Sequence, residues 1–179
     1  MARWEIRITR QSEQKRASDG KIRTVGHYQV FHDGVPQTGE DMSGTTAESR
    51  GPGANRPGGN GKCVEAGEYP LATQAGAKYV TLHYSSSANH TSLPRPGIEL
   101  LNTDQRSEIL IHPGIGFLAS IGCINLCKSL PDASEPISFA SSRRRVISVI
   151  DDMTAFLGGS FPNSNGKKIP GAFCVIEEA

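Results

Sequence analysis

The chain has 179 residues with a formal net charge of +1, and 36% of its residues are hydrophobic. This length fits one domain with its own core, which we place at residues 1–179. A net charge near zero does not indicate a nucleic-acid or anionic-membrane partner, and no apolar run approaches the ~18 residues of a membrane span. The 20 glycines and 11 prolines favour short strands joined by turns over a helical bundle.

The N-terminal part has the composition of two strands, at residues 4–9 and 22–31. The polar residues 11–20 between them predict a hairpin loop, and Asp33 with Gly34 predicts a turn. Residues 1–8 alternate polar and apolar side chains without an apolar core. We therefore expect a strand there and no signal peptide.

Two segments lack hydrophobic periodicity and are expected to be mobile loops, at residues 37–61 and 85–97. The first ends in a run rich in glycine and proline. This loop either covers a site as a lid or is a surface loop without a functional role, and the sequence leaves both possibilities open.

Further strands are expected at residues 63–71, 79–84, 98–101 and 108–111, and a final strand at 172–177. Residues 124–130 fit a short helix or a strand equally well. Helical spacing of apolar residues predicts one substantial helix that ends at Gly158, with Val146, Ile147, Ile150, Met153 and Leu157 on its apolar face. Arg143, Arg144 and Arg145 near its start form either a solvated face or a binding patch. The fold class is thus α+β, mainly β, with one C-terminal helix.

The segment from residue 111 to 126 contains a histidine and a cysteine at the edges of an apolar, glycine-punctuated stretch. A cysteine attacks carbonyls as the thiolate, so it needs a neighbouring base and donors for the developing oxyanion. His112 can be the base for Cys123. Small residues before the sulfur allow an acyl group and backbone N–H groups to approach it. The null hypothesis is a satisfied core histidine and an inert thiol.

Other histidines and cysteines provide alternatives. His27, His32, His83 and His90 are rival bases, with His83 the strongest because it lies on a predicted strand. All five histidines precede Cys123, which disfavours papain-like peptidases, where the cysteine comes first. Cys63 and Cys174 are either buried small hydrophobes or a disulfide. His112, Cys123 and Cys127 could hold zinc, but a fourth ligand at recognisable spacing is missing.

The pattern His112, then Ser120, Gly122, Cys123 and Asn125, resembles the active-site signature of the L,D-transpeptidase (YkuD-like) catalytic domain, a bacterial peptidoglycan enzyme. Ile121 stands where that family often has a histidine, and the His-to-Cys spacing of eleven positions is short for it. The short spacing is more similar to compact members found among type VI secretion effectors. The resemblance implies a sheet-built fold for the chain.

The resemblance also implies a mechanism without a metal or cofactor. Cys123, deprotonated by His112, attacks the third residue of a peptidoglycan tetrapeptide stem and expels D-alanine. Backbone N–H groups of Gly122 and Cys123 stabilise the oxyanion, while Ser120 and Asn125 position the substrate or the histidine ring. Water, an amine of a second stem or a free D-amino acid then resolves the thioester.

Peptidoglycan lies outside the cytoplasmic membrane, so export by a dedicated secretion system into the periplasm of a competitor is expected. An immunity protein would then be a second partner, in the producer cell. The alternative is a non-catalytic cell-wall or partner-binding module that keeps the fold after the site has decayed. Ile121 and the short spacing favour that alternative.

Overall fold

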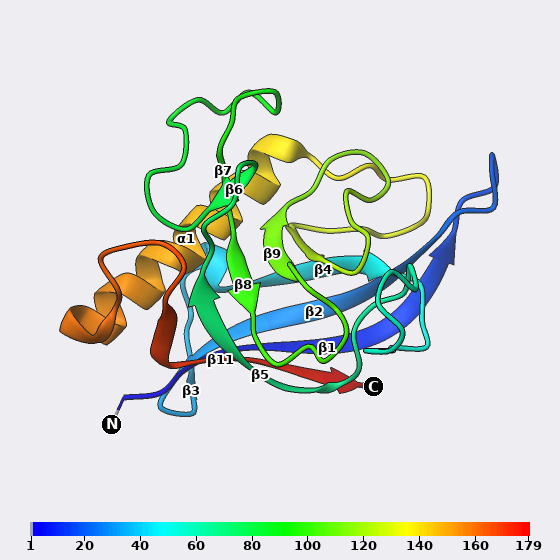
Figure 1. Cartoon of the computed structure of the whole chain (residues 1–179). Coiled ribbons are helices and arrows are strands. Elements are labelled where there is room, and N and C mark those ends of the chain that lie inside the picture. Colours follow the sequence, from blue (N-terminus) through cyan, green and yellow to red (C-terminus); the bar gives the residue numbers. More distant parts are fainter. Residues whose placement is uncertain (1) are drawn as a thin grey trace.

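The computed structural model describes residues 2–179, so Met1, the first residue of the predicted domain, lies outside the described residues. The expected class is confirmed, because most regular structure is strand and one long helix lies near the C-terminus (Figure 1). The strands are β1 (Trp4–Lys15), β2 (Ile22–His32), β3 (Val35–Pro36), β4 (Ser43–Ser49), β5 (Gly67–Thr73), β6 (Tyr79–Val80), β7 (Arg95–Pro96), β8 (Ile98–Leu100), β9 (Leu110–Pro113), β10 (Ile124–Cys127) and β11 (Lys168–Glu178). The helices are α1 (Phe139–Leu157) and the 3-10 turns η1 (Glu40–Met42) and η2 (Gly158–Ser160).

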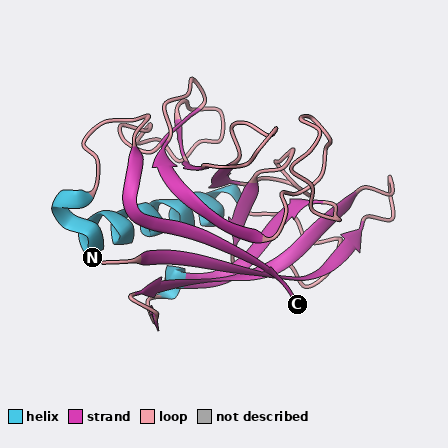
Figure 2. Ribbon diagram, turned by 60° about the horizontal axis from the view of Figure 1, so that its bottom comes forward, coloured by secondary structure: helices cyan, strands magenta, loops and turns pink. Residues whose placement is uncertain are grey.

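The main sheet closes on itself into a barrel. Its strand order is β1-β11-β5-β8-β9-β10-β4-β2, and β2 pairs back onto β1, while β3 continues the sheet outside β2. The strongly twisted strands wrap around the interior in Figure 2. Two pairs of adjacent strands are parallel, namely β1 with β11 and β9 with β10. The other strand pairs of this sheet are antiparallel. Closure gives residues 4–10 of β1 a partner strand on both sides, β11 and β2.

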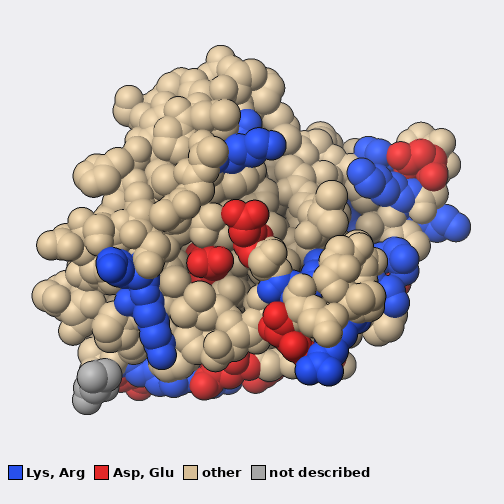
Figure 3. All heavy atoms as spheres, in the orientation of Figure 1, with Lys and Arg blue, Asp and Glu red and all other residues tan. Residues whose placement is uncertain are grey.

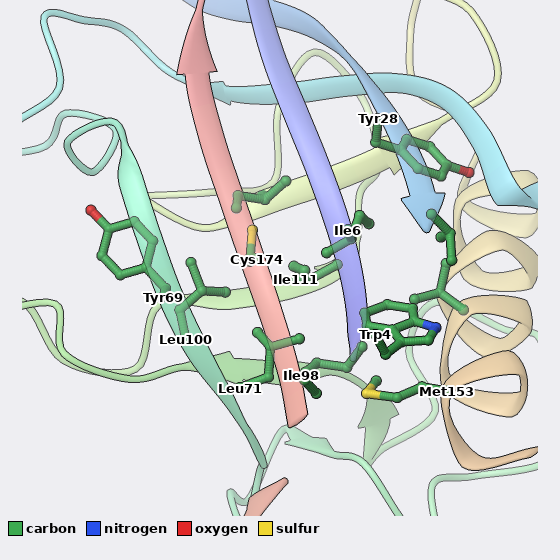
Figure 4. Close-up of a cluster of buried hydrophobic side chains, with 14 of the residues drawn as sticks. Trp4, Ile6, Tyr28, Tyr69, Leu71, Ile98, Leu100, Ile111, Met153 and Cys174 are labelled. Atoms are coloured by element: carbon green, nitrogen blue, oxygen red, sulfur yellow. The ribbon is translucent and has the colours of Figure 1, made fainter. Parts of the chain in front are cut away.

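The core lies inside the barrel and against α1. Alternate residues of β1 point inward, so Trp4, Ile6 and Ile8 are fully buried. Figure 4 shows Trp4 beside Met153 of α1, with side chains of β5, β8 and β11 next to them. The apolar face of α1 was predicted in large part: Val146, Ile150, Met153 and Leu157 are buried, whereas Ile147 is half-buried and fully buried Val149 was not predicted. The helix begins at Phe139, because Ser138 caps it through a hydrogen bond from the Ser141 N–H.

The expected loop at residues 11–20 is largely wrong. β1 continues to Lys15 and pairs with β2 along its whole length, so only residues 16–21 form the turn. A bulge between Arg10 and Ser12 lets the long strand bend. The polar side chains that suggested a loop belong to an exposed stretch of strand.

The expected mobile loop at residues 37–61 is also partly wrong, because it contains η1 and the barrel strand β4. β4 lies between β2 and β10 and is rich in polar residues. Its Glu48 is fully buried and accepts a hydrogen bond from Arg10 Nη2 at 2.7 Å. This pairing makes burial of a charged strand residue possible.

Smaller differences concern the ends of elements. The strand expected at residues 79–84 is limited to β6, since His83 has φ of 67° and cannot continue a strand. The strand expected at 63–71 lies at Gly67–Thr73, and the one expected at 98–101 ends at Leu100. The strand expected at 108–111 begins at Leu110 and includes His112, and the final strand is longer than 172–177. The open choice at 124–130 is settled as the strand β10, and residues 85–97 are loop up to β7.

The arginine run at the start of α1 is not a uniform solvated face. Arg145 is buried, and its Nη1 donates to the Tyr28 hydroxyl and to the Ser43 carbonyl, each at 2.8 Å. Arg143 donates to the Ser85 carbonyl at 2.8 Å. These arginines attach the helix to the sheet and to a loop. Within residues 2–179 no helix has the length and apolar character needed to cross a membrane.

Candidate active site

His112 and Cys123 come from neighbouring parallel strands and lie on one face of the sheet. Asn125 of β10 is in register with His112 of β9, and Cys123 precedes β10 by one residue. Side chains two residues apart on a strand share a face, so Cys123, Asn125 and His112 point the same way. Strand spacing and rise put the Cα atoms of Cys123 and His112 roughly 8 Å apart, within reach of their side chains.

The thiol of Cys123 is partly exposed and has two backbone partners. Its sulfur accepts a hydrogen bond from the Leu110 N–H at 3.3 Å, and the thiol donates to the Glu108 carbonyl at 3.4 Å. Burial raises the pKa of this thiol, while the Leu110 N–H and the positive charge of Arg106 oppose that rise. The resting form is therefore the thiol, with a donor already in place to stabilise a thiolate.

The imidazole of His112 is only 4% exposed. Its Nδ1 lies 2.8 Å from the Pro113 carbonyl, which can only accept, so Nδ1 carries the proton and Nε2 has the free lone pair. Burial lowers the pKa of His112 to about 4. The ring of Tyr79 covers it at 4.4 Å between centroids. Among the described residues, no hydrogen bond joins this ring to the Cys123 sulfur.

Asn125 fastens the loop that connects β9 to β10. Its Oδ1 accepts from the Ala119 N–H at 3.1 Å, and its Nδ2 donates to the Ala119 carbonyl at 3.2 Å and to the His112 carbonyl at 3.4 Å. Gly114 begins the loop, and a β-carbon there would lie 2.6 Å from Asn125 Oδ1. Asn125 therefore positions the loop around the thiol through backbone groups, and makes no hydrogen bond to the His112 ring.

Ser120 and Gly122 also engage the backbone of this loop. The Ser120 hydroxyl donates to the Cys123 carbonyl and makes no hydrogen bond to the His112 ring. Gly122 has φ of +94°, and its N–H donates to the Ser49 hydroxyl at 3.0 Å. The expectation that the Gly122 N–H serves the oxyanion is therefore not met here, because that donor is occupied. Ile121 is 75% exposed at the mouth of the site.

Four residues that surround His112 and Cys123 were not identified from the sequence. Tyr79 covers the imidazole, Glu108 accepts the thiol proton through its carbonyl, and Arg106 packs against Gly122. Ser142 of α1 accepts from the Gly114 N–H at 2.8 Å and so attaches the loop to the helix. Tyr79 and Ser142 are distant in sequence from His112, and Arg106 and Glu108 lie close before it but belong to no motif that the sequence analysis recognised.

The rival histidines lie elsewhere. His32 is 2.6 Å from Asp152 Oδ2 and stacks on Phe156, while His27, His83 and His90 are exposed. Within residues 2–179 none of the four forms a hydrogen bond with Cys123. His112 is the histidine that the sheet places on the same face as the thiol.

All four cysteines are free, so the disulfide alternative for Cys63 and Cys174 is wrong and both are buried thiols. Cys127 packs in a small apolar cluster with Val25 and Ala47. Among the described residues no group of three metal-ligating side chains gathers, and the zinc alternative through Cys127 is therefore not supported.

A cavity of about 680 Å³ opens between the β1–β2 hairpin and the residue 51–66 segment. Arg10, Glu13, Cys63 and Glu65 are among its lining residues, and no predicted site residue lines it. Figure 3 shows acidic side chains in the middle of one face and basic groups around them, without a continuous patch of one sign. The candidate site is thus separate from this cavity.

Comparison of the chain with protein-family models, with curated proteins and with solved structures found no match.

Proposed function

We propose that the chain is a cysteine-dependent enzyme that modifies peptidoglycan stem tetrapeptides, as an L,D-carboxypeptidase, an L,D-transpeptidase or an exchanger of D-amino acids. The supporting observation is the shared face of two parallel strands that holds a partly exposed thiol and an imidazole with its Nε2 lone pair free. The Leu110 N–H at the sulfur fits the same chemistry, because it stabilises a thiolate.

In the proposed reaction the Cys123 proton moves to His112 Nε2 while the sulfur attacks the carbonyl of the third stem residue. The C–N bond to the terminal D-alanine then breaks, and the imidazolium returns its proton to the departing amine. A thioester remains on Cys123. Water or an amine, deprotonated by neutral His112, attacks that thioester and restores the thiol.

The test is mass spectrometry of tetrapeptide muropeptides incubated with the protein, with and without a D-amino acid. The wild-type protein should release or exchange D-alanine, Cys123→Ala should abolish this, and Cys63→Ala should retain it as the matched cysteine control. Processing by Cys123→Ala at the wild-type rate would refute the assignment, and so would a wild-type protein that changes none of these substrates.

The cellular role we propose is an antibacterial effector acting in the periplasm of a target bacterium, with an immunity protein in the producer. Its support is the substrate class and the short spacing between His112 and Cys123. Expression with a periplasmic export signal should be toxic, whereas cytoplasmic expression and exported Cys123→Ala should be harmless. Equal harmlessness of the wild-type protein in both compartments would contradict this role.

A non-catalytic binding module is the second candidate. It is favoured by the cover of Tyr79 over His112 and by the sulfur's hydrogen bonds to the backbone alone. Thiol reactivity separates the two functions. An activated Cys123 should react with iodoacetamide or a carbapenem far faster than buried Cys63 and Cys174, and equal sluggishness would favour the module.

A further inference from the structure

A buried guanidinium without a carboxylate partner lies beside the candidate nucleophile. Arg106, in the loop between β8 and β9, is only 6% exposed. Its Nη1 donates to the Ala54 carbonyl at 2.9 Å. Among the salt bridges formed within residues 2–179, none includes Arg106. Arginine is seldom buried unless it is paired, so this charge needs an explanation.

The other end of the guanidinium reaches the residue next to Cys123. Arg106 Nη2 occupies the space that a β-carbon on Gly122 would need, so a larger residue at this position would displace the guanidinium. The positive charge acts on the sulfur as well, because it lowers the pKa of Cys123 against the effect of burial. The packing on Gly122 puts the guanidinium at the site, and its positive charge acts on the thiol from that position.

A second cation near the site, Arg95, already has an acceptor at the edge of its guanidinium formed by Nε and Nη2. Arg95 lies on the His112 side, and its Nε and Nη2 both donate to the His90 carbonyl, at 2.9 and 2.6 Å. Among the described residues, by contrast, Arg106 has an acceptor for Nη1 alone. Its remaining N–H groups form the fork that a carboxylate accepts in bidentate fashion.

We propose that Arg106 binds the terminal carboxylate of the substrate and so selects peptides that end one residue beyond the bond cleaved. This inference rests on the proposed function. The carboxylate of the residue that is expelled lies about one residue, roughly 3.5 Å of chain, from the carbonyl attacked by Cys123. Arg106 Nη2 packs against Gly122, the residue immediately before Cys123, so one residue of chain separates this contact from the nucleophile.

The first experiment tests the inference through alkylation rates of the Cys123 thiol and needs no peptidoglycan. Iodoacetate and iodoacetamide alkylate the same thiol and differ by one negative charge, so the ratio of their rates at Cys123 reports a nearby carboxylate-binding group. We expect this ratio to be about 10-fold or more above that of the urea-unfolded chain, as a hydrogen bond to a charged group gives. Arg106→Gln should return it to the unfolded value, and Arg56→Gln, which removes an exposed arginine, should leave it unchanged.

Two results would overturn the inference. One is a wild-type ratio no higher than that of the unfolded chain, which needs no variant and so holds even if Arg106→Gln fails to fold. The other is an Arg106→Gln protein, folded by circular dichroism, that slows both reagents equally. That outcome would make Arg106 a structural clamp between Ala54 and Gly122.

The second experiment separates this inference from the proposed function. Calorimetry compares the binding of a stem tetrapeptide and of its C-terminal carboxamide to Cys123→Ala. The acid should bind about 10- to 100-fold more tightly, and Arg106→Gln in the same background should remove the preference. Equal affinity of the free acid and the carboxamide would overturn the carboxylate role. A preference for the acid together with no turnover by the wild-type protein would instead refute only the enzymatic proposal.

Discussion

Acid sensitivity of folding is expected to depend on His112. Burial lowers the pKa of this histidine to about 4 in the folded chain, against an ordinary value of 6.5. Below pH 6.5 the unfolded chain therefore binds a proton that the folded chain does not, and stability falls as the pH falls. At about 1.4 kcal/mol for each pH unit, the loss reaches about 3 kcal/mol by pH 4.

The perturbation is His112→Gln, which removes this titration. The free energy of unfolding is measured in urea at pH 7.5 and 4.5, with the fluorescence of Trp4, the single tryptophan, as the signal. The wild-type protein should lose about 2.5 kcal/mol more than His112→Gln between these two pH values. Comparing each protein with itself removes any effect of the substitution that does not depend on pH.

His27→Gln is the control, because it replaces an exposed histidine of β2. It should show the acid sensitivity of the wild-type protein. If His112→Gln loses as much stability on acidification as the wild-type protein, the buried neutral imidazole cannot be the cause, and the reasoning is refuted.

Three further predictions concern the thiol and the loop around it. The rate of alkylation of Cys123 by iodoacetamide, measured by stopped flow, should rise with pH beyond 8.5, because the pKa of this thiol is raised. A plateau of the rate between pH 6 and 8 would indicate a thiolate–imidazolium pair instead. Asn125→Ala should cost about 1–3 kcal/mol in urea unfolding, because it leaves the Ala119 N–H and carbonyl unsatisfied. A stability equal to wild type would show that the loop does not depend on Asn125. Arg23→Met should speed proteolytic cleavage of the segments to which fully buried Arg23 donates, namely at the Phe117, Asp132 and Glu135 carbonyls, and unchanged cleavage would contradict that role.

The elements with strong local patterns could be predicted from the sequence. The apolar face of α1 repeats at helical spacing, and β1 and β2 alternate, so their existence was predictable even where their ends were not. β4 was missed because its buried Glu48 is compensated by Arg10, a residue 38 positions away. Closure of the barrel likewise depends on the distant pairing of β1 with β11.

His112 and Cys123, the two groups proposed to react, could be selected from the sequence, whereas the residues around them could not. A histidine, a cysteine and several glycines within one short segment are enough to suggest a thiol nucleophile and its base. Arg106 reaches the site from the loop between β8 and β9 and Tyr79 from β6, and neither has a local signature. That the Gly122 N–H is occupied by Ser49 depends on a contact between residues 73 positions apart, which no motif contains.

Because β9 and β10 are parallel, the short stretch of sequence between His112 and Cys123 does not set their distance in space. Two parallel strands cannot be joined by a tight turn, so residues 114–123 must travel back along the sheet before β10 begins. The ladder of hydrogen bonds, and not the length of this return path, sets how far His112 is from Cys123. Insertions in the path would alter what borders the sulfur, whereas His112 and Cys123 would keep their places relative to each other, because the strand pairing fixes them.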